Sequence, residues 1–291
     1  MNHPKVSIII LNWNGLGDTI ECLESLKKIT YPNYGIIVVD NGSSGSDVEA
    51  LRERYGDYIH IIQNEKNYGF AKGNNVGIRY VLAEGVDYVL VLNNDTVVAP
   101  TFLDELVSCC QKEHRIGAAG PKLYWYDNPA RVQLPELYEK VGDAPADMET
   151  LSGAAFLVGR EVWEQVGLLD EVFYPAYGED RDFFERLKEH RYRIVCVPAS
   201  KVYHKMSATA RRYPDLALYL MVKHSFRLAR RHRTNQSYVS SFEHLLKSIF
   251  VYFGVSLRTA IERRSLRPAV MFMRGTMEGV IIFLRNPKER W

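Results

Sequence analysis

Short apolar segments alternate with amphipathic segments along most of the chain. The apolar segments are rich in β-branched residues and about four to eight residues long, which is typical of buried strands. They predict strands at 6–11, 36–39, 58–63, 88–92, 116–123, 151–158 and 193–197. The amphipathic segments place apolar residues three and four apart and predict helices after Asp18 and at 47–55, 71–84, 102–113, 160–166 and 180–190. Strands alternating with helices in this way indicate an α/β fold with a largely parallel sheet.

Polar side chains follow several predicted strands directly. Asp40 ends the second strand, Asn94 and Asp95 follow the strand that begins at Tyr88, and His204 lies past the last strand. Open α/β sheets bind ligands at the carboxyl ends of their strands, so Asp95 is a candidate for a metal or phosphate site. The alternative is that Asn94 and Asp95 are ordinary turn residues. A lone histidine is more often structural, so His204 becomes a candidate ligand only if the fold brings it near Asp95.

A dinucleotide site is an alternative at the first strand. Gly15, Gly17 and Asp40 fit part of the dinucleotide-binding fingerprint, but Ile20 occupies the third glycine position and would hold the helix away from the strand. A nucleotide could also bind at the ends of these strands without a tight glycine turn. Asp40 would accept hydrogen bonds from a base or ribose while Trp13 packs on the ring; the alternative for Trp13 is core packing.

Three carboxylates open the helix predicted at 180–190. Glu179, Asp180 and Asp182 lie within four residues of each other, which is more than the helix macrodipole requires, although the macrodipole alone is an alternative reason for them. A carboxylate flanked by others has a raised pKa, which suits a general base. The segment 125–150 is polar and lacks a clear period, so it is predicted to be a mobile loop over the site.

Charge is distributed unevenly in the 291 residues, of which 46% are hydrophobic and 25% charged. Residues 201–291 hold 18 Lys and Arg against 5 Asp and Glu, whereas residues 1–200 hold 19 against 30. A basic end can bind nucleic acid, anionic lipid or an acidic substrate, and composition does not choose among them. The four cysteines show no metal or disulfide spacing, and no signal peptide precedes the first strand. The longest apolar stretch, 245–257, contains Lys247 and is too short to span a bilayer. These features predict a cytoplasmic protein able to rest on a membrane surface.

Six segments, in order, resemble glycosyltransferase family 2, the inverting GT-A group, and resemble its rhamnosyltransferase-like branch most. They are 4–14, 38–44, 67–75, 92–96, 178–182 and 198–204. The resemblance implies a GT-A catalytic domain over 1–210, with a Rossmann-like, mixed and mostly parallel sheet flanked by helices. Residues 211–291 are then a basic helical extension, expected to contact a membrane, the acceptor or a second subunit in a homodimer.

The resemblance also implies roles for individual residues. The donor, a nucleotide-diphosphate sugar, would be bound by Leu11, Trp13, Asp40, Asn67, Gly69, Asn74 and Asn94. Asn93 to Asp95 takes the place of the family's Asp-x-Asp, so Asp95 should bind Mg²⁺ or Mn²⁺ bridging the diphosphate, with His204 as a further metal ligand. Because Asn93 replaces the first aspartate by a neutral amide, Asp95 is expected to carry the metal largely alone among the motif residues.

Asp180 matches the family's catalytic base, and Glu179 and Asp182 are expected to support it or to contact the acceptor. The implied reaction moves a sugar from a dTDP- or UDP-linked donor, with rhamnose favoured, to a hydroxyl of a glycan or lipid-linked acceptor in surface polysaccharide assembly. Nucleic acid is not an expected partner. Two alternatives stay open: a nucleotidyltransferase, although residues 12–18 lack the basic residues that it would need, and a non-catalytic nucleotide-sugar-binding protein.

Overall fold

The structure is a computed structural model that describes residues 3–139, 141–205, 213–232 and 238–284. The predicted domain boundary at 210 lies outside the described residues. The chain forms two compact units. We call Met1–Pro175 with Glu179–Met206 the sheet unit, and Ala176–Gly178 with Ser207–Trp291 the helical unit.

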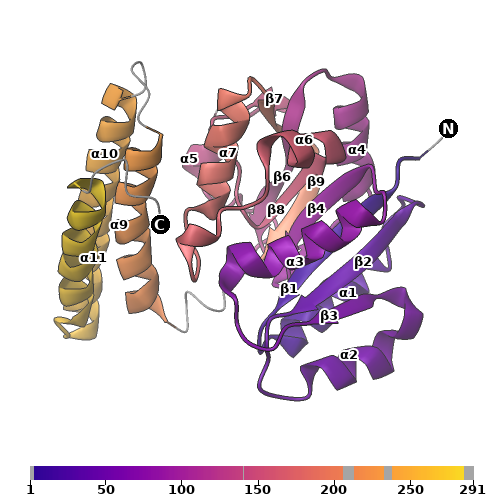
Figure 1. The fold of residues 1–291 in the computed structure, drawn as a ribbon, viewed down its shortest axis with the longest axis horizontal. Coiled ribbons are helices and arrows are strands. Elements are labelled where there is room, and N and C mark those ends of the chain that lie inside the picture. Colours follow the sequence, from indigo (N-terminus) through magenta and orange to yellow (C-terminus); the bar gives the residue numbers. More distant parts are fainter. Residues whose placement is uncertain (1–2, 140, 206–212, 233–237, 285–291) are drawn as a thin grey trace. The chain divides into compact units, whose positions relative to one another are not determined.

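The sheet unit contains one mixed sheet flanked by helices (Figure 1). Its strands are β1 (Val6–Asn12), β2 (Tyr34–Asp40), β3 (His60–Gln63), β4 (Tyr88–Asn93), β5 (Thr96–Val98), β6 (Ile116–Trp125), β7 (Ala146–Asp147), β8 (Ala155–Gly159) and β9 (Arg193–His204). They lie in the order β3-β2-β1-β4-β8-β6-β9-β5, and β7 pairs with β9. β1 to β4 pair in parallel, as the alternating pattern predicted, and β8 joins β4 to β6 through antiparallel pairs.

Helices connect the strands of the sheet unit. They are α1 (Leu16–Leu26), α2 (Asp47–Tyr55), α3 (Gly69–Ala83), α4 (Phe102–Lys112), α5 (Pro135–Tyr138), α6 (Arg160–Val166) and α7 (Glu179–Glu189), with short 3₁₀ turns η1 (Gly56–Tyr58) and η2 (Glu171–Phe173). β1 and β4 run through the middle of the core, and Ile8, Ile9 and Leu90 are inaccessible to solvent. The continuous apolar runs are therefore buried strands, because both faces of these strands are covered.

The structure corrects three expectations of the sequence. In the helix predicted at 71–84, the apolar spacing predicts that Val76, Tyr80 and Val81 face inward, but Tyr80 is exposed and stacks on His60. The last strand was predicted to end at 197, but β9 continues to His204. It can do so because β6 pairs with it on one side and β5 with its final residues on the other.

The third correction concerns the segment 125–150, which was predicted to be a mobile loop. Its described residues contain α5 and β7, and an isolated bridge joins Val132 to Tyr124. Tyr138 and Gln133 are buried. The segment is ordered by pairing with β6 and β9, which are distant partners that local periodicity does not reveal.

The helical unit consists of α9 (Pro214–Arg231), α10 (Tyr238–Arg263) and α11 (Arg267–Leu284). Leu218, Val222 and Phe226 of α9 form an apolar cluster with Leu245 and Phe272. None of the described helices combines the length and the apolar character needed to cross a membrane.

Candidate active site

The predicted polar residues gather at the carboxyl ends of the parallel strands. Asn12, the last residue of β1, is in register with Asp40, the last residue of β2. On the other side of β1, Leu11 is in register with Asn93 at the end of β4. Asp40 and the Asn93–Asp95 motif therefore lie on the same edge, two strands apart.

Asp40 is fully buried and organises the loop that follows β2. Its carboxylate accepts hydrogen bonds from the side chain of Asn12 (2.8 Å), the Ser43 hydroxyl (2.6 Å) and the Ser43 amide (3.0 Å). The same Asn12 amide donates to Asp47 (3.0 Å) at the start of α2. Sequence reasoning did not single out Asn12, whose role depends on the register of β1 and β2.

A second amide, Asn41, joins the end of β2 to the segment before α3. Its Nδ2 donates to Asn67 Oδ1 (3.0 Å) and to the Gly69 carbonyl (3.1 Å), while its Oδ1 accepts from the Tyr68 amide (3.0 Å). Asn74 is buried one turn into α3 and donates to the carbonyl of Phe70 (2.9 Å). Asn41 thus links Asn67 and Gly69 to the end of β2, next to Asp40.

Trp13 lies just past β1 and is 38% exposed. The core-packing alternative for this residue is therefore wrong. Leu11, the penultimate residue of β1, is partly buried against the core. Trp13 presents aromatic surface at the strand edge that holds Asp40.

Asp95 and His204 meet at the edge where β4 gives way to β5. Thr96 is in register with His204 in the β5–β9 pair, and Asp95 accepts a backbone hydrogen bond from Lys205 (3.0 Å). This pairing brings His204 Nε2 to 3.2 Å from Asp95 Oδ1, and both side chains are buried. The condition under which His204 becomes a candidate ligand is met.

Gln133 orients the imidazole of His204. The Gln133 Nε2 donates to the carbonyl of His204 (2.7 Å), which turns its Oε1 toward His204 Nδ1 at 3.1 Å. In a neutral ring this contact places the proton on Nδ1, which donates to Oε1, and the lone pair of Nε2 then faces Asp95. Gln133 is itself buried and held by its amide on the carbonyl of Leu123 (2.9 Å). Nothing in the local sequence marked this residue.

This arrangement fits a divalent cation. A carboxylate oxygen and an imidazole lone pair that face each other at 3.2 Å are complementary to a positive charge, and both are good ligands for Mn²⁺. A histidine that binds a metal usually donates its other ring N–H to an oxygen, which fixes the orientation of the ring. Within the described ranges no cluster of three or more His, Cys, Asp or Glu side chains could hold a metal. Asp95 and His204 would supply two ligands, and oxygens of a bound diphosphate would add others.

Asn94 points away from Asp95 toward α1. Its Nδ2 donates to the Thr19 hydroxyl (2.9 Å), and a Cβ added to Gly15 would lie 2.6 Å from the same nitrogen. A side chain at position 15 would therefore displace the Asn94 amide. Gly15 serves this contact, and Ile20, at the third glycine position of the dinucleotide fingerprint, packs on the core, so the match to that fingerprint stays incomplete.

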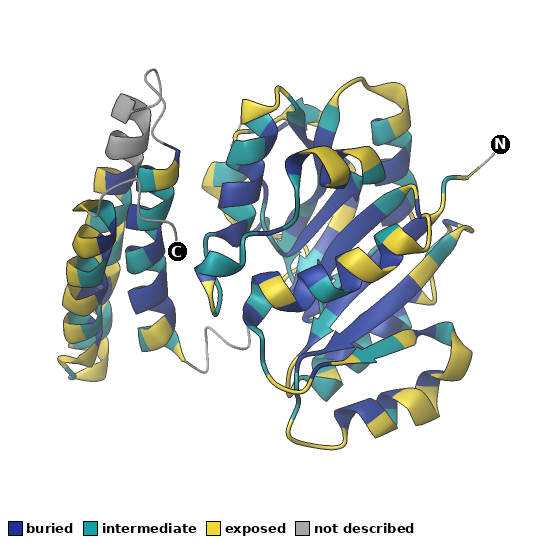
Figure 2. Cartoon of the chain, in the orientation of Figure 1, coloured by how far each residue is buried: buried dark blue, intermediate teal, exposed yellow. Residues whose placement is uncertain are grey.

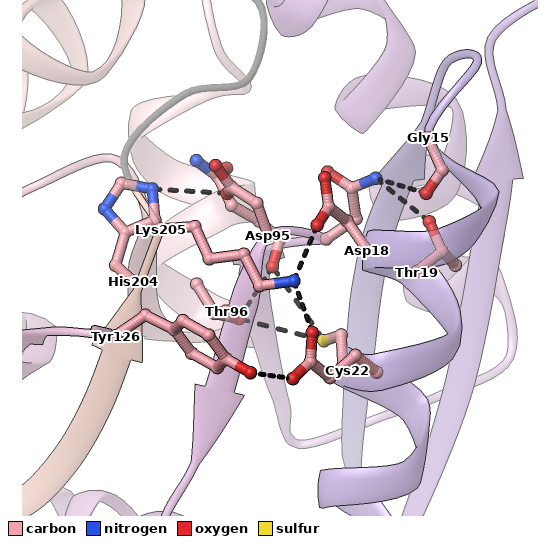
Figure 3. A network of polar contacts seen from close by, with 12 residues as sticks. Gly15, Asp18, Thr19, Cys22, Asp95, Thr96, Tyr126, His204 and Lys205 are labelled. Carbon is pink, nitrogen blue, oxygen red and sulfur yellow. Dashed lines mark hydrogen bonds and ion pairs between the residues drawn. The ribbon is translucent and has the colours of Figure 1, made fainter.

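A network around Lys205 fixes the end of β9 (Figure 3). The Lys205 ammonium donates to Asp18 (2.7 Å) and Glu21 of α1 and lies 4.9 Å from the ring centre of Tyr126, whose hydroxyl donates to Glu21. Burial lowers the pKa of Lys205, but the hydrogen bonds to Asp18 and Glu21 outweigh it, so the net shift is upward. Lys205, the residue after His204, is thus held against α1 by two ion pairs.

Asp180 occupies the first turn of α7 and is partly buried. Its carboxylate accepts hydrogen bonds from the amides of Arg181 (2.7 Å) and Gly153 (3.1 Å). Burial raises the pKa of Asp180, and these two amides oppose the rise without cancelling it. Only a glycine fits at 153, because a Cβ there would lie 2.6 Å from Asp180 Oδ2.

The hydrogen bond from the Gly153 amide relates the position of Asp180 to that of Asp95, a candidate metal ligand. Gly153 precedes β8, and the carbonyl of its neighbour Ala154 accepts from the amide of Asn93 (2.8 Å) at the end of β4. Asp95 lies two residues further on. Since β8 runs antiparallel to β4, its first residues lie at the carboxyl end of β4, and Asp180 is held at that same edge.

The other two carboxylates of the cluster differ from Asp180. Glu179 is buried, and burial followed by the charge of Asp180 raises its pKa well above the usual range. Asp182 is inaccessible and pairs with Arg186 (2.9 Å), whose guanidinium also donates to the carbonyls of Val166 and Leu168. Asp182 therefore ties α7 to the segment after α6, which fits the supporting role and leaves no surface for an acceptor.

A cavity of about 870 Å³ lies elsewhere in the sheet unit, lined by Asp87, Arg115 and Arg160 among others. It adjoins the start of β4 and of β6, whereas the predicted residues lie past the carboxyl ends of β1, β2 and β4. None of the predicted site residues lines it.

Comparison with known proteins agrees with this geometry. The family model described as "Glycosyl transferase family 2" matches residues 7–173. The chain belongs to glycosyltransferase family 2. As a family 2 glycosyltransferase of glycan biosynthesis, it is not the nucleotidyltransferase that the sequence left open.

Several relatives of this family 2 enzyme have names. It is 22% identical to "dTDP-rhamnosyl transferase RfbF" from Shigella flexneri, and the match covers 96% of each chain. It is 27% identical to "N-acetylglucosaminyl-diphospho-decaprenol L-rhamnosyltransferase" from Mycobacterium tuberculosis over 69% of this chain and 76% of that protein. Some relatives are far longer: this chain spans 18% of "O-antigen biosynthesis protein RfbC" from Myxococcus xanthus.

Solved structures confirm the GT-A fold. TarS residues 1–349 from S. aureus, in complex with UDP-GlcNAc, superpose with a TM-score of 0.68 at 16% identity, covering 96% of this chain and 81% of that one. The mannosyltransferase PcManGT from Pyrobaculum calidifontis, in complex with GDP-Man and Mn²⁺, gives 0.66 at 15% identity, covering 97% and 86%.

Proposed function

We propose that this glycosyltransferase is metal-dependent and inverting, and that it transfers a sugar from a nucleotide-diphosphate donor to a hydroxyl of a glycan or lipid-linked acceptor. The observation that carries the proposal is the convergence of Asp95 and His204 at 3.2 Å on the edge that also holds Asp180. One side of that edge can receive a diphosphate and the other a hydroxyl.

The nucleoside would lie at the ends of β1 and β2. Trp13 offers an aromatic face, and Leu11, Asn67, Gly69 and Asn74 supply the adjoining surface. Asp40 is buried with three hydrogen bonds already made, so it sets the shape of this pocket through Ser43 and accepts from the nucleoside with its remaining lone pairs. Asn94 would act beside it by holding the start of α1.

The diphosphate would lie next to Asp95 and His204. When bound there, Mg²⁺ or Mn²⁺ neutralises the charge that develops on the leaving diphosphate. Asp95 and His204 hold that cation, and Gln133 keeps His204 in the ligating tautomer. Lys205, paired with Asp18 and Glu21, fixes the backbone next to His204.

Asp180 would act as the general base. Its carboxylate takes the proton of the acceptor hydroxyl while the hydroxyl oxygen forms a bond to the anomeric carbon. The bond from that carbon to the diphosphate oxygen breaks on the opposite face, and the nucleoside diphosphate leaves with its electron pair. The anomeric configuration is inverted, and no covalent intermediate on the enzyme is needed.

Two relatives point to a rhamnose donor and a lipid-linked acceptor, since their names contain dTDP-rhamnosyl and diphospho-decaprenol. We therefore include dTDP-rhamnose first and UDP-sugars next among the donors to be tested. A lipid-linked acceptor would also place the enzyme on the inner face of the cell membrane as a peripheral protein.

A panel of nucleotide sugars tests the proposal without knowledge of the acceptor. With Mn²⁺ present, the true donor should raise the melting temperature most and should slowly release its nucleoside diphosphate to water. A panel in which no nucleotide sugar shifts melting would contradict the donor site.

Asp180→Asn is the matched variant for this panel. It should keep donor binding nearly unchanged, because Asp180 does not touch the nucleotide in the proposal, and lower turnover about 10²- to 10⁴-fold, as loss of a general base does. Calorimetry gives the first quantity and product release the second. Turnover equal to that of the unmodified enzyme would mean that the chain binds a sugar nucleotide without Asp180 as base.

A further inference from the structure

Two helices of the helical unit carry apolar side chains on an uncovered face. Many of the exposed apolar residues of α10 and α11 recur three or four positions apart, and these form a stripe along each helix. Phe250, Ile261 and Leu266 are 82%, 77% and 78% exposed. The stripes consist of Leu246, Phe250, Phe253, Leu257 and Ile261 on α10, and of Val270, Met273, Met277 and Ile281 on α11 with Leu266 just before it. Figure 2 shows exposed residues recurring along both helices.

The stripes lie largely beside the faces by which these helices pack, although Phe253 also contacts the packed side, with its ring centre 5.6 Å from that of Phe272. α11 meets α9 through glycines: a Cβ at Gly275 would lie 2.8 Å from the carbonyl oxygen of Tyr219, and one at Gly279 would lie 2.3 Å from the ring of Phe226. Phe272 lies on this buried side of α11. A helix that is apolar on two faces is expected to cover both, and exposed apolar patches of this kind mark interaction sites.

Basic side chains accompany the stripes. Between 245 and 284 the chain has six of them, Lys247, Arg258, Arg263, Arg264, Arg267 and Arg274, and two acidic residues, Glu262 and Glu278. Both acidic residues already pair with arginines on their own helix. Three arginines, at 263, 264 and 267, surround the turn between α10 and α11, where Ile261 and Leu266 are exposed. Arg263 and Arg267 share one acidic partner, Asp215 of α9, so the turn keeps a net positive charge.

We propose that these two stripes and their basic residues, together the α10–α11 surface, bind an anionic lipid bilayer, with both helices lying on the membrane. Apolar side chains would enter the boundary between headgroups and acyl chains, while arginines meet lipid phosphates. The turn combines two strongly exposed apolar residues with three arginines, which complements an anionic interface.

Charge favours a membrane over a second copy of this chain. A two-fold contact brings the same patch of each copy together, so the arginines around the α10–α11 turn would face one another. The cores of protein interfaces are depleted of charged residues, whereas this surface is rich in arginine. An anionic bilayer is opposite in charge along its whole extent.

Binding to lipid does not depend on the proposed function. Only its consequence does: an enzyme held on the bilayer reaches a lipid-linked acceptor without leaving the membrane plane. Release of nucleoside diphosphate from the donor in water needs no membrane, so it reports on the active site separately.

Vesicle flotation tests the proposal with the full chain. The protein should float with vesicles of phosphatidylcholine and phosphatidylglycerol, less with phosphatidylcholine alone, and less at high salt. The variant Phe250→Ser/Ile261→Ser/Leu266→Ser removes three exposed side chains outside the packed cluster and should lower binding to anionic vesicles about tenfold or more. Its circular dichroism and its release of nucleoside diphosphate should match the unmodified enzyme.

A charge pair of variants supplies the matched control. Arg258→Gln/Arg264→Gln should weaken binding to anionic vesicles, whereas Lys28→Gln/Arg52→Gln, which removes the same charge from exposed positions of the sheet unit, should not. Equal flotation of the serine variant and the unmodified protein would overturn the proposal. So would a dimer in solution that dissociates in the serine variant, because the stripes would then be an interface between copies.

Discussion

Two opposing effects act on the pKa of a single residue, Asp180. Burial raises the pKa of its carboxyl, and the amides of Arg181 and Gly153 only partly offset the rise. A base must be deprotonated, and a carboxyl with a raised pKa stays protonated to a higher pH. The rate should therefore fall on acidification through a pKa above the ordinary range of aspartate.

The pH profile of kcat/KM checks this expectation. Glu179 also has a raised pKa, so the profile should be repeated with Glu179→Gln. If kcat/KM of Glu179→Gln still falls on acidification with a pKa above the ordinary aspartate range, that pKa is assigned to Asp180. An acid limb at or below that range in the unmodified enzyme would contradict the assignment.

Gln133 is the residue whose role depends most on tertiary structure. Gln133→Leu keeps the volume but removes the acceptor for His204 Nδ1, so affinity for Mn²⁺ with nucleoside diphosphate present should fall about 10- to 100-fold. Mn²⁺ paramagnetic resonance measures this directly. Gln133→Glu retains an acceptor and should recover part of the affinity; unchanged Mn²⁺ binding in the leucine variant would show that His204 needs no such orientation.

Residues at strand ends could be predicted from the sequence, whereas their partners could not. Asp40, Asp95 and Asp180 follow or open elements whose limits are visible in the apolar pattern. Gln133 lies in a segment without a period, and it meets His204 only because β6 and β9 pair. Asn41 and Lys205 likewise form their hydrogen bonds with residues more than twenty positions away, which the local sequence does not predict.

Among the elements, α7 depends on the buried pair of Asp182 and Arg186. The carboxylate is inaccessible and the guanidinium nearly so, and Arg186 also satisfies two backbone carbonyls after α6. Arg186→Leu leaves a buried charge without this partner and should destabilise the fold by about 3–5 kcal/mol in urea unfolding.

Lys188→Leu on the same helix is the control for this expectation. Lys188 pairs with Glu185 and Glu149 nearer the surface, so its loss should cost at most about 1 kcal/mol. Equal destabilisation by the two variants would contradict the supporting role of Asp182.

The alternation of strands and helices was predictable because each buried strand has a continuous apolar run. The short β5 was not, since its residues follow directly on the Asn93–Asp95 turn and become a strand only by pairing with β9. The order of β8, β6 and β9 is also set by pairings distant in sequence. The pattern therefore predicts the elements well and the second half of the sheet poorly.

At the scale of the whole molecule, the proposed active site and the proposed membrane-binding surface lie in parts of the chain that differ in charge. Residues 1–200 are acidic overall and contain Asp40, Asp95 and Asp180 of the strand-edge site, while residues 201–291 contribute His204 and carry 18 basic against 5 acidic residues. Acidic ligands at the edge require a counter-charge when a diphosphate binds, and a divalent cation supplies it. We therefore expect the cation to bind at Asp95.

Calorimetry of nucleoside diphosphate binding, with and without Mn²⁺, tests that claim most directly. The unmodified enzyme should bind the diphosphate more tightly with Mn²⁺, and Asp95→Ala should lose that gain while retaining the weaker metal-free binding through the nucleoside pocket. If the unmodified enzyme binds equally well in both conditions, or if Asp95→Ala keeps the full Mn²⁺-dependent gain, Asp95 is not the metal ligand of this glycosyltransferase.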